Sequence, residues 1–514
     1  MGNISRRHLL ASLAAATAIA ALPAWAQETA KPAAPRQPNL LVIHCDQLNF
    51  RTLGCYREQL PPNLAFIWGN GVSVSTPNID SLAKNGAICN KFYATSPVCT
   101  PSRAALLTGR YPQNTGAIGN NKPFTNMIIT FAEVLRLQGY ATGYAGKWHL
   151  DGGAKPGWAP KRQFGFEDNT YMFNRGHWKK LEDSPKGPVA VGGENDRATK
   201  TADEKSFTTD FLADKAVSFI KSHKEKPFCY MVSFPDPHTP RTVRAPYDTM
   251  FKNLYFQSPR SSKEDGEGLP SWGTTLGNGF GNAAEYFGMI KCIDDNVGKI
   301  LKELREDGLL DNTYIVFTAD HGDMCGEHGR NAKSLPFEAS AKIPFVISAP
   351  GKIKPGTVVN AALGNVDFKP TIQKLLGLPA DARDEGRDAS ILFLTGKTPP
   401  DWFDITFVRI GEGSSGWLGA FNSQYKLVVS PRTNPCLFDL EKDPYEMTNR
   451  FLRPECRETV RALAKALNDY GLRRKDPLAQ DPVIHADLDW AVNGIGDYVP
   501  VKRNRNPEKP NEED

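Results

Sequence analysis

Four segments of this sequence carry chemically active side chains directly after an apolar run. The segments are Asp46-Gln47, Lys147-Trp148-His149, Asp236-Pro237-His238 and Asp320-His321. Carboxylates, amides and imidazoles can ligate a divalent cation, whereas lysine and histidine can neutralise an anion or transfer protons. One such segment is usually a surface loop, but four together predict a shared site.

A fifth segment, Cys99-Thr100-Pro101-Ser102-Arg103, places a thiol beside the start of a predicted helix. We expect Thr100 to be the N-cap, Pro101 the first helical residue, and Gly109 to lie past the end. The helix dipole and the free N–H groups would then favour an anion next to Cys99. By chance, a Cys-x-Pro-x-Arg pattern arises in roughly a few such chains per hundred. The alternative, a buried structural cysteine, must also explain the other four segments.

The elements that must position these residues are alternating strands and helices. We predict helices over 130–139, with a Thr130–Glu133 capping box, and over 286–309. The predicted strands are 40–45, 142–145, 228–234, 314–318 and 345–348. Nearly continuous apolar runs suit strands buried on both faces, so we expect an α/β core with a mostly parallel sheet. Ligands of such sheets gather beyond the carboxyl ends of the strands.

The character of the chain changes after Pro379, and we place a domain boundary near residue 395. Short strand-like runs at 406–410, 417–421, 425–430 and 436–440 are separated by Gly, Asn and Pro, which is typical of an antiparallel sheet. We therefore predict a catalytic domain over 40–394 and a C-terminal subdomain with a tail over 395–514. Two polar stretches, 181–206 and 257–282, are interpreted as surface insertions.

The N-terminus has the three parts of a secretory signal: Arg6-Arg7, an apolar run over 9–22, and Ala24-Trp25-Ala26. We predict a signal peptide of the twin-arginine type over 1–26 and a tether over 27–39. The protein would then use the twin-arginine export machinery and be periplasmic or secreted. An uncleaved anchor is the alternative, although the run is shorter than the ~20 residues that span a membrane.

The charge of the chain argues against a nucleic-acid-binding protein, and its cysteine spacing argues against a zinc site built from cysteines. The 62 Lys+Arg and 57 Asp+Glu leave a formal net charge of +5 over 514 residues, so we expect no nucleic-acid partner. The nine cysteines are odd in number and follow no zinc-ligand spacing. We expect several of them to be small core residues, and their pairing is left open.

From Pro38 to about Arg450, the chain resembles the type I sulfatases of the alkaline phosphatase superfamily. Its motifs stand in the family order: Cys99-Thr-Pro-Ser-Arg103, Gly-Lys147-Trp-His149, Pro-His238-Thr-Pro, Asp320-His321-Gly, Gly326-Glu-His-Gly-Arg-Asn-Ala-Lys333, Phe337-Glu338, and Leu437-Phe-Asp-Leu-Glu-Lys-Asp-Pro-Tyr-Glu446. The resemblance implies an alkaline-phosphatase-like fold with a large mixed, mostly parallel sheet, and hydrolysis of sulfate monoesters.

The resemblance also implies how the reaction is carried out. The family's cysteine is oxidised to formylglycine by a formylglycine-generating enzyme, and Cys99 matches it. Its hydrate would be the nucleophile, held by Arg103. Lys147 and Lys333 would bind the sulfuryl oxygens. His238, which would also bind substrate, is the expected general acid, and His149 is the expected base for the second hydroxyl.

One divalent metal is implied as a cofactor. The implied ligands are Asp46, Gln47, Asp320, His321 and the modified Cys99. We expect Ca²⁺, with Mn²⁺ or Mg²⁺ as alternatives, because an imidazole moves the preference towards Mn²⁺. Gln47 is either a ligand or a residue that supports the ligands.

Two positions depart from the commonest family pattern, which has Asp-Asp and Asp-Asn where this chain has Asp46-Gln47 and Asp320-His321. The same substitutions occur in choline sulfatases and in relatives that hydrolyse phosphonate monoesters and phosphodiesters. Such a hydrolase is therefore one alternative. A catalytically silent binder of sulfated glycans is another, if Cys99 is unmodified.

The expected substrate is a sulfated small molecule or carbohydrate. Aromatic residues between Trp158 and Trp178 are interleaved with Arg175 and His177. They form either a platform for a sugar ring or ordinary loop packing. The sugar, the sulfated position and the oligomeric state are left open by the sequence.

Overall fold

The computed structural model describes residues 36–125, 127–270, 272–273, 279–411 and 416–503. The predicted signal peptide over 1–26, most of the 27–39 tether and the end of the tail lie outside the described residues. Within these ranges no helix is both long and apolar enough to cross a bilayer. All nine cysteines are described, buried and free of disulfides, which confirms the prediction that several of them are core residues.

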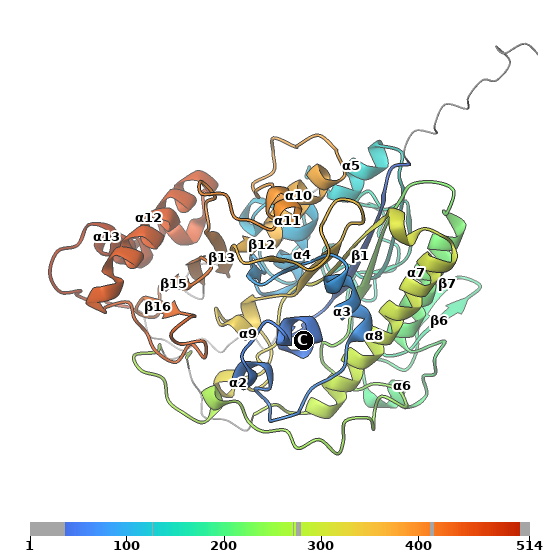
Figure 1. Ribbon diagram of the computed structural model, residues 1–514, viewed down its shortest axis with the longest axis horizontal. Helices are drawn as coiled ribbons and strands as arrows, with labels where there is room; N and C mark the ends of the chain where they lie inside the picture. The colour runs from blue at the N-terminus through green and yellow to red at the C-terminus, as the bar shows by residue number, and fades with distance from the viewer. Residues whose placement is uncertain (1–35, 126, 271, 274–278, 412–415, 504–514) are drawn as a thin grey trace, which may run out of the picture. The chain divides into compact units, whose positions relative to one another are not determined.

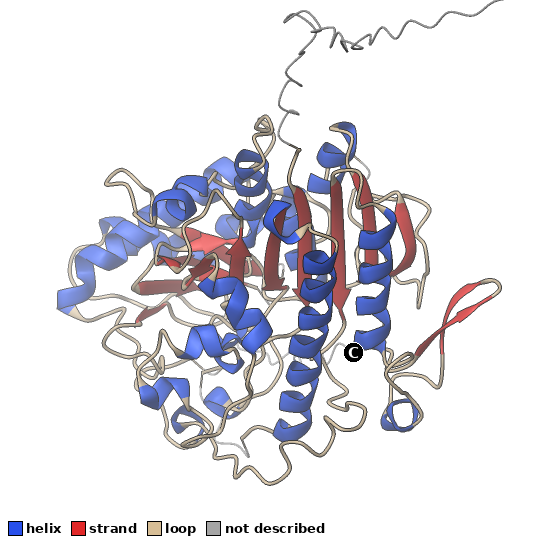
Figure 2. Cartoon of the chain, turned by 45° about the vertical axis from the view of Figure 1, so that its right-hand side comes forward, coloured by secondary structure: helices blue, strands red, loops and turns tan. Residues whose placement is uncertain are grey.

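An eight-stranded sheet carries the fold (Figure 2). In sheet order its strands are β11 (Thr357–Val359), β2 (Ala87–Cys89), β10 (Phe345–Ser348), β9 (Thr313–Ala319), β1 (Asn39–Cys45), β8 (Phe228–Phe234), β4 (Ala141–Lys147) and β5 (Asp168–Phe173). Strand β10 is antiparallel to both of its neighbours, and the other pairs are parallel. The predicted mixed, mostly parallel sheet is confirmed.

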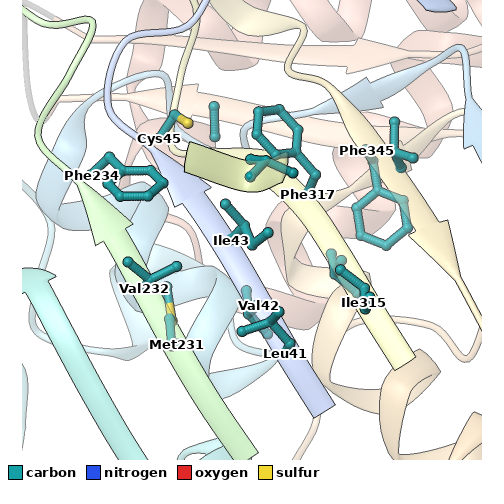
Figure 3. Packing of buried hydrophobic residues seen from close by; sticks show 14 of the residues in the cluster. Leu41, Val42, Ile43, Cys45, Met231, Val232, Phe234, Ile315, Phe317 and Phe345 are labelled. Carbon is teal, nitrogen blue, oxygen red and sulfur yellow. The ribbon is translucent and has the colours of Figure 1, made fainter. Parts of the chain in front are cut away.

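The centre of the sheet is apolar on both faces. All seven residues of β1 are buried, which explains its continuous run of Leu, Val and Ile. Figure 3 shows Val42 and Ile43 of β1 beside Val232 of β8 and Ile315 of β9. The main hydrophobic core therefore surrounds the strand that lies between β8 and β9.

Helices cover both faces of the sheet (Figures 1 and 2). Gly143 of β4 faces Phe219 of α7 (Thr208–Ser222). The next residue, Tyr144, contacts Phe166, which in turn contacts Phe131 of α5 (Phe131–Leu137). Because successive strand residues point to opposite faces, α7 and α5 lie on opposite sides. One layer contains α3 (Pro77–Lys84), α7 (Thr208–Ser222) and α8 (Ala283–Glu306), and the other contains α4 (Cys99–Thr108), α5 (Phe131–Leu137), α10 (Phe368–Leu375) and α11 (Ser390–Thr395).

The predicted helix ends are partly confirmed. The Thr130–Glu133 capping box at α5 is present, with the Thr130 hydroxyl accepting from the Glu133 N–H at 3.1 Å. Helix α8 begins at Ala283, three residues before the predicted start. Gly109 ends α4 with a φ of 67°. The prediction that Thr100 caps α4 is wrong, because the helix already begins at Cys99 and the Thr100 hydroxyl donates to the His149 carbonyl at 2.7 Å.

A four-stranded antiparallel sheet follows, as predicted. It consists of β13 (Thr406–Ile410), β14 (Trp417–Phe421), β15 (Tyr425–Val429) and β16 (Cys436–Asp439), and helices α12 (Arg457–Arg474) and α13 (Pro482–Asn493) pack beside it. Ala105 and Val366 share one hydrophobic cluster with Leu418 of β14 and Leu467 of α12. The boundary near residue 395 stays a prediction.

The remaining elements are short. The predicted 181–206 insertion contains a hairpin of β6 (Leu181–Ser184) and β7 (Gly187–Ala190), seen at the right of Figure 2, and α6 (Asp196–Lys200). The others are α1 (Gly54–Arg57), α2 (Pro62–Ala65), α9 (Glu338–Ala341), β3 (Phe92–Tyr93) and β12 (Leu363–Gly364).

Candidate active site

The four chemically active segments meet because their strands are neighbours. Strands β9, β1, β8 and β4 are adjacent in the sheet and parallel, so their carboxyl ends lie at one edge. Asp320 follows β9, Asp46 follows β1, His238 lies in the loop after β8, and Lys147 ends β4. The structure therefore places these side chains in one region, as the sequence predicts.

The backbone at this edge takes conformations that most residues avoid. Gln47 and His149 both have left-handed φ angles, 63° and 62°. Gly146, directly before Lys147, has a φ of 108°, and a Cβ there would lie 1.9 Å from the Ser233 carbonyl oxygen. Only glycine fits this position, and left-handed non-glycine residues concentrate at functional sites.

Cys99 is at the centre of the cluster and is buried at the first residue of α4. Its Sγ lies 3.2 Å from the His321 Nε2 and 3.8 Å from the Asp46 Oδ1. Two ammonium groups approach it as well, Lys333 Nζ at 3.6 Å and Lys147 Nζ at 3.8 Å. The side chain at position 99 thus stands between cations and metal-ligating atoms.

These neighbours change the acidity of the Cys99 thiol. Burial and the Asp46 carboxylate both act to raise its pKa, but Lys147, Lys333 and His321 lower it, and the pKa of Cys99 lies below its ordinary value. The helix N-terminus acts in the same direction. Any anionic form of the side chain at position 99 is therefore stabilised.

Arg103 joins the two carboxylates. Its guanidinium donates to Asp320 Oδ2 at 3.0 Å and to Asp46 Oδ2 at 3.1 Å, and it also binds the Ser233 hydroxyl at 2.9 Å. Burial alone would raise the pKa of Asp46, but Lys147, His238, His177 and Arg103 hold that pKa well below its usual range. Both carboxylates are buried anions, and the predicted contact of Arg103 with the formylglycine hydrate stays a prediction.

Four ligating groups converge at a possible metal position. One ligand atom each from Asp46, Cys99, Asp320 and His321 lies within 4.8 Å of the others. His321 Nδ1 lies 2.9 Å from the Gly322 carbonyl oxygen, which can only accept, so Nδ1 carries a hydrogen and Nε2 is the nitrogen that faces the cluster. This donor set fits a divalent cation, and the identity of the ion stays a prediction.

The side-chain amide of Gln47 is held by Asp323, a residue that the sequence analysis missed. The Gln47 amide nitrogen donates to Asp323 Oδ2 at 2.7 Å, which directs Oε1 to the opposite side, where Lys333 Nζ lies 3.1 Å away. Arg241 also binds Asp323 Oδ2, at 2.7 Å. The nearness of Asp323 to His321 in the sequence was the one signal that could have identified it.

His238 and Lys333 form a pair. His238 Nδ1 lies 2.8 Å from the Thr239 carbonyl oxygen, so this nitrogen carries the hydrogen and Nε2 accepts from Lys333 Nζ at 2.9 Å. Burial first, and then the charges near it, hold the pKa of His238 well below its ordinary value. In this structure the predicted general acid is therefore a neutral imidazole, and the proton between it and Lys333 is on the ammonium group.

His149 lies on the α4 side of the site. Its Nε2 lies 3.2 Å from the Asn121 Oδ1, while its buried Nδ1 has no hydrogen-bond partner. Burial lowers the pKa of His149, and Lys147 lowers it further, so the imidazole is neutral and able to accept a proton. This state suits the base predicted for this residue.

His177 is a second residue of the site whose role the sequence analysis missed. Its Nε2 lies 2.8 Å from the Lys147 Nζ and 3.9 Å from the Asp46 Oδ2, and its ring stacks on that of His238. The sequence placed His177 in the aromatic segment over 158–178. Within that segment, Phe164, Phe166 and Phe173 are buried in the main core, so for these three residues the packing interpretation is correct.

Comparison with known proteins identifies related chains. The sequence model of the sulfatase family matches residues 38–378, and a model described as N-sulphoglucosamine sulphohydrolase, C-terminal, matches residues 326–473. The N-acetylglucosamine-6-O-sulfatase of Bacteroides thetaiotaomicron is 25% identical over 86% of this chain and 87% of that protein.

Two solved structures share the fold. BT4656, solved in complex with its substrate D-glucosamine-2-N,6-O-disulfate, superimposes with a TM-score of 0.71 at 22% identity, over 87% of this chain and 100% of that one. The phosphonate monoester hydrolase of Agrobacterium radiobacter superimposes with a TM-score of 0.66 at 23% identity, over 86% of this chain and 97% of that one. One fold therefore carries proteins named for two different transferred groups.

Proposed function

Because this chain belongs to the sulfatase family and is thus a sulfuric ester hydrolase, we propose that it hydrolyses sulfate monoesters of carbohydrates through a formylglycine formed at Cys99. The observation that supports this proposal most directly is the surroundings of Cys99. Atoms of Lys147, Lys333, Asp46 and His321 lie within 4 Å of its Sγ. The sulfated amino sugars in the names of related proteins support a carbohydrate substrate.

The charges of the site suit a sulfuryl group. Lys147 and Lys333 approach position 99 and would bind the sulfuryl oxygens. Asp46, Asp320, His321 and Gln47 would hold a divalent metal, which supplies positive charge and lowers the pKa of a hydroxyl at position 99. A hydrated formylglycine there would supply an oxygen nucleophile.

Proton transfer falls to two histidines. In the resting site Lys333 Nζ holds the proton and donates it to His238 Nε2 at 2.9 Å. His238 would take up this proton, which leaves Lys333 neutral, and would pass it to the leaving oxygen. His149 is neutral and has a free buried Nδ1, so it would accept a proton from the side chain at position 99. Arg103 keeps the two carboxylates in place throughout.

A phosphonate monoester or phosphodiester hydrolase is the second candidate. It is favoured by Gln47 and His321, and by the structural similarity to a phosphonate monoester hydrolase. A silent glycan binder would result if Cys99 were never converted. We further propose export through the twin-arginine machinery to the periplasm or the exterior, after modification by a formylglycine-generating enzyme.

One experiment tests both the modification and the transferred group. The Cys99 peptide should be lighter by about 18 Da than its thiol form, the difference between –CH₂SH and an aldehyde. The modified protein should hydrolyse nitrophenyl sulfate faster than the matched phosphodiester and phosphonate, and the Cys99→Ala variant should be folded and nearly inactive. Full activity from thiol protein would overturn the formylglycine, and preference for the phosphonate would favour the second candidate.

A further inference from the structure

We infer that His177 is a positioning residue that holds the Lys147 ammonium with its Nε2 and holds the His238 ring with its own ring. The inference rests on the proposed sulfatase function, and it assigns a role to a residue outside the motifs of the resemblance. His177 is buried, and both contacts are short: 2.8 Å from Nε2 to the Lys147 Nζ, and 3.6 Å between the two ring centroids.

The contact with Lys147 fixes the proton of His177. An ammonium group can only donate, so the Nε2 of His177 accepts and its hydrogen is on Nδ1. Lys147 Nζ also donates to Asp46 Oδ2, at 2.6 Å. The ammonium is therefore held between a carboxylate and an imidazole, and both contacts must be kept for it to face the sulfuryl group in one position.

The geometry argues against a second metal at this point. Asp46, His177 and His238 do bring three possible ligand atoms within 4.8 Å of one another. However, the Lys147 ammonium already lies 2.6 Å from one of these atoms and 2.8 Å from another. A metal ion there would be repelled by that charge at close range, so the cation of this cluster is the lysine itself.

The two stacked rings belong to segments that are tied together nearby. The rings are parallel, with an interplanar angle of 1°. Lys179, two residues after His177, forms a fully buried ion pair at 2.6 Å with Asp236, two residues before His238. Thr209 of α7 donates to the second oxygen of Asp236. The stack is thus anchored by a buried link, and His177 limits the tilt of the ring that would protonate the leaving oxygen.

The two roles can be separated by two substitutions. His177→Gln places an amide oxygen near the former Nε2 and removes the ring, whereas His177→Phe keeps a ring and removes the acceptor. The acceptor should matter for binding the sulfuryl group, and the ring should matter for protonating the leaving group. If His177 were needed only for packing, the two variants would not differ in sulfate binding or in their dependence on the leaving group.

The test compares both variants with the exposed control His485→Gln. Calorimetry with inorganic sulfate measures binding, and kcat/KM for phenyl and nitrophenyl sulfate measures leaving-group dependence. His177→Phe should weaken sulfate binding by about 10- to 100-fold, because it removes a hydrogen bond to a charged group. The ratio of kcat/KM for phenyl sulfate to that for nitrophenyl sulfate should be unchanged. His177→Gln should bind sulfate within about 3-fold of the parent, while phenyl sulfate loses about 2- to 10-fold more rate than nitrophenyl sulfate.

Equal losses in both variants on all three measurements would overturn the inference, and so would parent behaviour in both. Two metal ions per chain in the parent, with one lost in either variant, would replace it with a second metal site. If the parent hydrolyses neither these two esters nor a sulfated carbohydrate, the proposed function fails, but sulfate binding still decides the acceptor role. A double-mutant cycle of His177→Phe with Lys147→Met should show coupling in sulfate binding, and additive effects would contradict it.

Discussion

Replacing His238 separates protonation of the leaving group from binding of the sulfuryl group. A general acid matters most when the leaving oxygen is strongly basic, as in a sugar alkoxide, and least for an acidic nitrophenol. The structure places the His238 Nε2 2.9 Å from the Lys333 Nζ and buries the ring. His238→Ala therefore removes both a proton donor and an acceptor for Lys333.

The loss of the Lys333 contact and the loss of the general acid differ in size and in the substrates that they affect. Losing the partner of the Lys333 ammonium costs ~1.5–3 kcal/mol, which is about 10- to 100-fold on every sulfate ester. Losing the general acid costs a further ~10²–10⁴-fold, and this factor should appear with the sugar or alkyl sulfate alone. His238→Gln keeps an acceptor for Lys333. The loss of rate on every sulfate ester should therefore be smaller than in His238→Ala, while the further loss with the sugar or alkyl sulfate should remain.

The assay is kcat/KM for an alkyl sulfate and for nitrophenyl sulfate in the parent and in both His238 variants. His149→Ala is the matched control, because a base that acts after the leaving group has departed should slow both substrates alike. Equal losses for the two substrates in His238→Ala would refute the reasoning and make His238 a binding residue only.

Two predictions concern the metal and pH. Asp320→Ala should lower metal content and turnover together, because the ion requires this buried carboxylate as a ligand. Elemental analysis after dialysis measures the metal content. A metal-free enzyme with the parent rate would contradict the prediction. Burial lowers the pKa of His328 to about 3, so the unfolded chain takes up the proton first as pH falls below ~6.5. Stability should therefore be lost on the acid side, by about 2 kcal/mol from this residue at pH 5 relative to pH 7. His328→Asn, which tolerates the left-handed backbone there, should flatten this slope in urea unfolding, and the exposed control His485→Asn should keep it.

Local signals in the sequence were sufficient for most elements. The continuous apolar run of β1 is typical of a strand covered on both faces, and the Thr130–Glu133 pair marks a helix start whatever surrounds it. The four antiparallel strands from Thr406 onward were recognisable from their length and the turn residues between them. Each of these signals acts over a few neighbouring residues, so no distant contact is needed to interpret it.

The start of α4 shows where local reasoning stops. Thr100 is a good N-cap residue by type, but its hydroxyl is used by the His149 carbonyl, and the helix begins one residue earlier than Thr100. The sequence contains no sign of this contact, because it joins the first turn of α4 to the loop after β4, and their approach depends on the order of the strands. Tertiary contact therefore outweighed the local preference.

The sequence by itself determined which residue types follow the central strands, and hence that a site with metal ligands, lysines and histidines would form at one edge of the sheet. Only the tertiary structure decided how these groups divide their tasks. It placed His177 between Lys147 and His238, and turned the Gln47 oxygen away from Asp323. Such contacts depend on ångström-scale distances between segments that are joined only through the packed sheet, and these distances leave no local pattern in the chain.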